Sequence, residues 1–142
     1  YCEDAYLIMP LKNFSAKLTS QTIKKAYVID NSFCSIMSYS LSQDIGRLME
    51  NLVFVELKRR GKELYYFKGQ NECDFIIKEK EKIVAAVQVC YNLTKDNSER
   101  EIKGLQEVKE KFKLKDMKII TFDQETKIGD IEVLPFFKFI AK

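Results

Sequence analysis

The fold of this chain is decided by residues 42–103, SQDIGRLMENLVFVELKRRGKELYYFKGQNECDFIIKEKEKIVAAVQVCYNLTKDNSEREIK. Apolar residues recur at helical spacing at the start of this stretch, alternate in its middle, and return to helical spacing at its end. The pattern predicts a helix, three strands and a second helix. The strands are expected at residues 63–68, 72–78 and 83–91, and the second helix at residues 98–112.

Capping residues mark the ends of these helices. Ser40 and Gln43 have the spacing of a capping box, and Gly61, which follows two arginines, is a typical C-terminal stop. Ser98 and Glu101 repeat the capping-box spacing. We therefore expect the first helix to end just before Gly61 and the second to begin near Ser98.

Elements outside this stretch complete an α/β fold. The three strands are expected to pair as an antiparallel meander, and a strand at residues 117–122 should join them through the crossover made by the second helix. A strand at 130–134 and a short helical tail after Pro135 follow. Strands at residues 3–12 and 25–29 predict an N-terminal hairpin with a long loop. The predicted architecture is a mixed sheet flanked by helices, preceded by a hairpin.

The bulk composition fits one globular domain. The chain has 142 residues, of which 46% are hydrophobic and 32% are charged, and its net charge is only +3. This length suits one hydrophobic core, and contact with DNA would need a local basic patch because the overall charge is small. No apolar run is long enough to cross a bilayer, so we expect no membrane partner and a cytoplasmic location.

The sequence contains four cysteines and no histidine. The cysteines lack CxxC spacing, which argues against a structural zinc site and favours reduced, buried thiols. The lack of histidine excludes Ser-His and Cys-His nucleophiles, and a thiol enzyme using Cys73 or Cys90 would have no histidine to activate it. There is no P-loop pattern, so no ATP site is expected in these residues.

Three polar residues are predicted to lie among apolar neighbours. Glu50 lies on an apolar side of the first helix, away from a narrow exposed stripe that includes Asn51. A buried, unpaired carboxylate there would cost about 2–7 kcal/mol, so Glu50 should have a partner. If the turn after the second strand of the meander centres on Glu81, Asp74 lies opposite Gln88 on the next strand, and a slip of one residue would break this pairing.

These positions resemble a nuclease signature. The PD-(D/E)xK superfamily carries a Glu on the first helix and an Asp on the second core strand, and its third strand carries Glu or Gln, then any residue, then Lys. The matching positions here are Glu50, Asp74, Gln88 and Cys90. More closely, the runs GRLMENLVFVELKRRG, NECDFII, VQVCYNL and SEREIKGL resemble the C-terminal domain of unknown function carried by many prokaryotic AAA-type ATPases. The resemblance covers most of the chain and implies a restriction-endonuclease-like core.

The resemblance also implies a divalent-metal site. Mg²⁺ prefers oxygen ligands, usually one or two carboxylates with waters and phosphate. Asp74 would be the main ligand for Mg²⁺ or Mn²⁺, Glu50 would bind directly or through water, and Gln88 would offer its amide oxygen. Such a metal polarises a phosphodiester and lowers the pKa of a bound water.

The signature lysine is missing, because Cys90 occupies its position and a thiol cannot supply a cation. Gln88 also carries less charge than a carboxylate, so the resemblance implies a weakened or lost activity. Arg100 and Lys103, on the second helix, are the candidates for a substitute cation.

Each of these residues has a purely structural interpretation as well. Glu50 could form an ion pair or a hydrogen bond in a crowded core, and Gln88 could be an amide at a strand edge. A lone strand aspartate such as Asp74 is explained about equally well either way. Cys90 is explained better as a small buried thiol than as a functional group.

Two functional hypotheses follow. The first is a metal-dependent nuclease module that acts on DNA, partnered by the ATPase domain of a larger parent chain, with residues 1–30 as the linking segment and residues 31–142 as the nuclease-like domain. The second is a non-catalytic regulatory module that keeps the fold and binds DNA, a partner protein or the ATPase domain.

Overall fold

The computed structural model describes residues 7–14, 23–32 and 45–141. Six strands form one mixed sheet in the order β3-β4-β5-β6-β8-β7. The strands are β3 (Glu63–Lys68), β4 (Glu72–Glu79), β5 (Lys82–Val89), β6 (Asp116–Thr121), β7 (Thr126–Ile128) and β8 (Ile131–Pro135).

The pairing of these strands follows the predicted topology. β3, β4 and β5 form an antiparallel meander, whereas β5–β6 and β6–β8 are parallel and β7 returns antiparallel to β8. The order of helix, three-stranded meander, helix and strand is that of the restriction-endonuclease-like core, so the expected fold class is confirmed. β7 is a short strand that the sequence did not predict.

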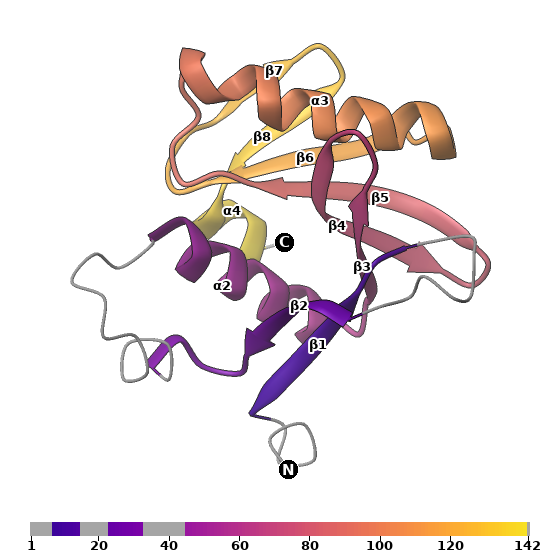
Figure 1. The fold of residues 1–142 in the computed structure, drawn as a ribbon. Coiled ribbons are helices and arrows are strands. Elements are labelled where there is room, and N and C mark those ends of the chain that lie inside the picture. Colours follow the sequence, from indigo (N-terminus) through magenta and orange to yellow (C-terminus); the bar gives the residue numbers. More distant parts are fainter. Residues whose placement is uncertain (1–6, 15–22, 33–44, 142) are drawn as a thin grey trace.

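Helices cover both faces of the sheet (Figure 1). The helix α3 (Lys95–Phe112) packs on one face, and α2 (Ile45–Arg59) and α4 (Phe136–Ala141) pack on the other. Each face has its own buried apolar cluster, one centred on Phe54 and Phe75 and the other on Leu105 and Ile119. Because helices cover both faces of the sheet, most of its residues are buried and its strands are largely apolar.

The N-terminal hairpin belongs to the same core. β1 (Ile8–Lys12) and β2 (Ile23–Val28) pair antiparallel, as predicted. Leu11 and Tyr27 are buried in the cluster on the α2 face. Directly after β1, the backbone N–H of Phe14 donates to the carbonyl of Tyr66 at 2.8 Å, which ties the hairpin to the free edge of β3.

The helix ends were predicted with mixed success. α2 ends at Arg59, and Gly61 has the positive φ (70°) expected of a C-terminal stop; the predicted start at Ser40 and Gln43 lies outside the described residues. The start of α3 at Ser98 was wrong: the helix begins one turn earlier, after Thr94. The backbone N–H of Thr94 donates to the side chain of Asn97 at 2.8 Å, which is half of a capping box.

The cysteines and the apolar runs of the chain were also considered in the sequence. Cys73 and Cys90 are free and buried, as predicted, whereas Cys2 and Cys34 fall outside the described residues. In the described part of the chain, no helix is long and apolar enough to cross a membrane.

Candidate functional site

The site lies where β4 and β5 separate. Their ladder of backbone pairs runs from the turn to Phe75 and Val87. One residue further, side chains take the place of ladder bonds: the N–H of Asp74 donates to the amide oxygen of Gln88 at 3.1 Å, and the N–H of Val89 donates to Asp74 Oδ2 at 3.0 Å. The expected register therefore holds at this point, which we call the fork of the sheet. The other carboxylate oxygen of Asp74, Oδ1, is left for a different partner.

That partner is Lys25, on strand β2 of the hairpin. Its ammonium nitrogen lies 3.1 Å from Asp74 Oδ1, 3.1 Å from Glu50 Oε1 and 2.8 Å from Glu72 Oε1. Three segments that are far apart in sequence, namely β2, α2 and the start of β4, thus meet around one cation. We call Lys25, Glu50, Glu72 and Asp74 the carboxylate cluster.

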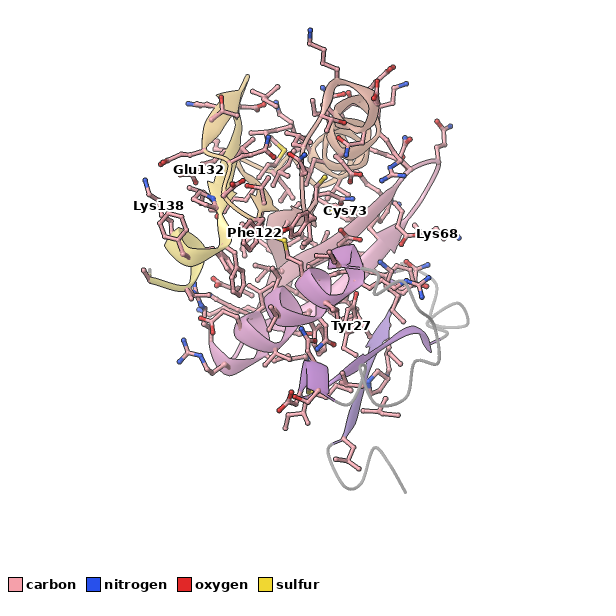
Figure 2. All side chains as sticks on the ribbon, turned by 90° about the vertical axis from the view of Figure 1, so that its left-hand side faces the viewer. Tyr27, Lys68, Cys73, Phe122, Glu132 and Lys138 are labelled. Atoms are coloured by element: carbon pink, nitrogen blue, oxygen red, sulfur yellow. The ribbon has the colours of Figure 1, made fainter. Side chains whose placement is uncertain are left out.

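Glu50 is held from a second side by Tyr27. The phenol of Tyr27 donates to Glu50 Oε1 at 2.5 Å, and its ring stacks on Phe54 of α2 with centroids 4.1 Å apart. Figure 2 shows Tyr27 where the hairpin and α2 meet. Glu50 therefore has the partner that was expected for a carboxylate among apolar residues, and this partner comes from the hairpin.

Hydrogen bonds to α2 also fix the position of the hairpin. Asn51, predicted to be exposed, is only 4% exposed. Its amide side chain accepts from the backbone N–H of Val28 and donates to the carbonyl of Val28, both at 2.9 Å. An amide that satisfies both backbone groups of a strand residue acts like an additional ladder pair, so it holds β2 against the helix that carries Glu50.

On the α3 side of the fork, Gln88 is committed to structural bonds. Besides accepting from the backbone of Asp74, its amide nitrogen donates to Glu101 Oε2 at 2.6 Å. Glu101 is only 3% exposed, and its other oxygen accepts from the guanidinium of Arg100. The amide oxygen predicted as a metal ligand is therefore already bonded to the backbone of Asp74.

The predicted lysine position contains no ionic group. Cys90 Sγ lies 3.3 Å from the carbonyl oxygen of Asn92 and accepts from Asn97 Nδ2 at 3.5 Å. Burial and the nearby carboxylate of Glu101 raise the pKa of the Cys90 thiol above its ordinary value. A thiol held neutral in this way is a poor nucleophile, which argues further against a thiol enzyme.

The substitute cations considered from the sequence are paired along α3 itself. Arg100 binds its neighbour Glu101, and Lys103 pairs with Glu99 at 2.7 Å on the exposed side of the helix. The basic residue that contacts Asp74 and Glu50 is Lys25, which sequence reasoning missed. Its only sequence signal was a charged side chain in a short β-strand, and most such residues face solvent.

The cluster holds more negative than positive charge. Three carboxylates face one ammonium, so the net charge is −2 when all four groups are ionised. Burial, reinforced by the nearby Glu50, raises the pKa of Asp74 to about 6, although Lys25 opposes the rise. Burial alone would lower the pKa of Lys25, but Asp74, Glu50 and Glu72 together raise it above its ordinary value. The site therefore has the capacity to accept further positive charge.

The donor atoms of the cluster are of the type that divalent metal ions prefer. Mg²⁺ and Mn²⁺ prefer carboxylate oxygens, and Asp74, Glu50 and Glu72 provide them at one point. Within residues 7–14, 23–32 and 45–141, no three Cys, Asp or Glu side chains are placed so that they could hold a metal ion as they stand. Their oxygens surround the Lys25 ammonium instead, so a metal ion would bind beside that ammonium.

The fold and the site define a class: an α/β domain of restriction-endonuclease-like core with acidic residues gathered at the fork of its sheet. Residues 45–139 match the family model described as "Domain of unknown function (DUF4143)", and the chain belongs to that family. It is 42% identical, over 153 aligned positions, to an uncharacterized protein of Methanocaldococcus jannaschii. The alignment covers 97% of this chain and 34% of that relative, so the chain spans about a third of the relative's length. No solved structure matches the chain.

Proposed function

We propose that this chain is a nuclease-like domain of the PD-(D/E)xK superfamily that hydrolyses DNA phosphodiesters with a divalent metal ion. The observation that carries the proposal is the meeting of Glu50 and Asp74, from separate elements, at the fork of the sheet within 3.1 Å of one ammonium nitrogen. A chain that needed only a stable core would gain little from gathering three carboxylates there, because burying charge is costly.

On this proposal, some residues of the site bind the metal ion and others hold those residues in position. Asp74 and Glu50 would hold Mg²⁺ or Mn²⁺, with Glu72 beside them, and a metal bound there would supply Lewis-acid polarisation of the phosphate and a more acidic water. Val89 fixes one oxygen of Asp74 through its backbone N–H, and Tyr27 fixes Glu50 through its phenol. Gln88 orients Asp74 by bonding its backbone, rather than by binding the metal itself.

We also propose that the domain works as part of a larger AAA-type ATPase in the cytoplasm. The relative from Methanocaldococcus jannaschii is about three times as long as the aligned region, which leaves room for an ATPase domain. The sequence resemblance set out above points to the same context. On this proposal, the ATPase domain delivers DNA to the nuclease-like domain.

The test is cleavage of plasmid and branched DNA by the full-length protein in Mn²⁺. We expect cleavage that Asp74→Asn and Glu50→Gln each reduce by at least about 100-fold, the typical cost of losing an essential electrostatic group. Asp116→Asn is a matched control, because Asp116 is also a strand aspartate paired with a lysine but is exposed on β6. Equal cleavage by the wild type and Asp74→Asn, or no cleavage by either, would exclude the nuclease function.

A non-catalytic module is the second candidate, and the bonding of Gln88 and the neutral thiol of Cys90 favour it. Two of the four signature positions are committed to structure, and the charged cluster could then serve only to hold the hairpin on the domain. On this alternative, Asp74→Asn leaves the biological function of the parent protein intact while the folded domain still binds DNA or its ATPase partner.

A further inference from the structure

We propose that Lys25, from the β1–β2 hairpin, is the catalytic cation of this site and replaces the basic side chain that position 90 lacks. The inference rests on the proposed function, since it assigns a residue to that reaction. It adds a chain segment that the family match does not include, because the matched residues are 45–139.

Geometry places Lys25 at the centre of the cluster. Its nitrogen contacts Asp74, Glu50 and Glu72 within 3.1 Å, and the contacts to Glu50 and Asp74 span 25 and 49 residues of sequence. The side chain of Lys25 is 22% exposed, so it is partly buried while its ammonium is held by the three carboxylates. A phosphate arriving at the cluster would meet an ammonium and acidic residues together.

The strand that carries Lys25 is held in place by α2 and by β1. Tyr27, two residues further along β2, bonds Glu50, and Asn51 of α2 holds the backbone of Val28. The pairing of β1 with β2 includes Leu11 opposite Lys25. A flexible surface lysine loses side-chain entropy when it binds; here that entropy is already lost in the fold, so the cation is preorganised.

In the reaction, Lys25 would stabilise charge without transferring a proton. A P–O bond forms to the oxygen of water and one ester P–O bond breaks; water gives up a proton, and the leaving oxygen gains one. The products are a phosphate monoester and an alcohol. Negative charge grows on the non-bridging oxygens during this exchange, and an ammonium beside them lowers the barrier. Lys25 also lowers the repulsion between the carboxylates and the incoming phosphate.

The test measures DNA cleavage and Mn²⁺ affinity in parallel, the latter by titration followed with electron paramagnetic resonance. Lys25→Met should cut the rate at least 100-fold while Mn²⁺ binds as tightly as in the wild type or more tightly, because a competing positive charge has been removed. Lys25→Arg should recover part of the rate. Lys12→Met is the matched control, since Lys12 is an exposed lysine of the same hairpin, and it should behave as the wild type.

A second variant guards against misfolding. Lys25→Met leaves three carboxylates unbalanced, so Lys25→Met combined with Glu72→Gln restores the original net charge of −2. The double variant should fold and should show the same loss of cleavage, with Mn²⁺ still held by Asp74 and Glu50.

The outcomes separate this inference from the function on which it rests. A wild type that cleaves, with Asp74→Asn inactive and Lys25→Met active within about threefold, overturns the role of Lys25 alone. Loss of Mn²⁺ binding in both Lys25→Met variants also overturns it, because Lys25 would then only hold the cluster together. A wild type that neither cleaves DNA nor binds Mn²⁺ overturns both.

Discussion

Neutralising Asp74 should make the metal-free protein progressively more stable, relative to the wild type, as the pH rises. The perturbation is Asp74→Asn, which removes one negative charge from the carboxylate cluster and keeps the shape of the side chain. The amide oxygen can still accept the hydrogen bond from the N–H of Val89. The pairing with Lys25 is lost, but Lys25 keeps Glu50 and Glu72 as partners.

The magnitude follows from the pKa of Asp74. Burial and the neighbouring Glu50 raise that pKa from the ordinary value of 3.8 to about 6 in the folded protein. The folded state therefore holds the proton of Asp74 more tightly than the unfolded state. The stability that this proton contributes is fully present below pH 3.8 and is lost as the pH rises through about 6. The full difference between the folded and unfolded pKa of Asp74 corresponds to about 3 kcal/mol of stability, and we expect about 1–3 kcal/mol because the charges of the cluster interact with one another.

The assay is urea denaturation of both proteins between pH 4 and pH 8 in the presence of EDTA. The free energy of unfolding of Asp74→Asn minus that of the wild type should increase by about 1–3 kcal/mol across this range and level off above pH 7. A difference that is independent of pH, or that decreases with rising pH, would refute the reasoning. It would mean that Lys25 neutralises Asp74 fully and that the cluster is an ordinary ion-pair network.

Three further outcomes are expected. Glu56→Gln should show the opposite pH dependence. Hydrogen bonds from two neighbouring arginines lower the pKa of Glu56 to about 2. The ionised carboxylate therefore contributes to the free energy of unfolding above pH 4.5, and this contribution is lost as the pH falls towards 2. The variant should lose about 1–2 kcal/mol at pH 7 and little at pH 2.5, measured by urea denaturation. Gly104→Ala should lose about 1–3 kcal/mol in the same assay, because the added Cβ would lie 2.3 Å from the carbonyl oxygen of Glu72 and force α3 away from β4. Mn²⁺ at about 100 times its Kd should stabilise the wild type by about 2.7 kcal/mol in thermal unfolding and leave Asp74→Asn almost unchanged, whereas equal shifts would argue against a site at Asp74.

The sheet could be predicted because its residues are locally consistent. Alternating apolar residues predicted β3, β4 and β5, and the register expected from the sequence placed Asp74 beside Gln88, as the structure does. The stop of α2 followed from one residue, Gly61, whose positive φ few other residues adopt at low cost. The start of α3 was missed because two capping patterns lie one turn apart, and Asn97 rather than Glu101 caps the helix.

Side chains that act across long distances in the chain could not be predicted in the same way. Glu101 has the pattern of a capping residue, yet it is buried against Gln88. Asn51 has the pattern of an exposed helix residue, yet it binds the backbone of β2. In both cases the partner comes from a different element, and helical periodicity contains no information about which polar residue a neighbouring strand will need.

Lys25 shows where the boundary of the functional unit should be drawn. A unit cut at residues 45–139 keeps Glu50 and Asp74 but loses the ammonium that contacts both, and the phenol that fixes Glu50. It also removes Leu11 and Tyr27 from the core on the α2 face, where each is at most 6% exposed. Loss of two large buried side chains costs several kcal/mol, about as much as the whole stability of many domains. The hairpin is therefore required by the fold and by the charge balance of the site for separate reasons, and the smallest unit worth testing for activity includes it.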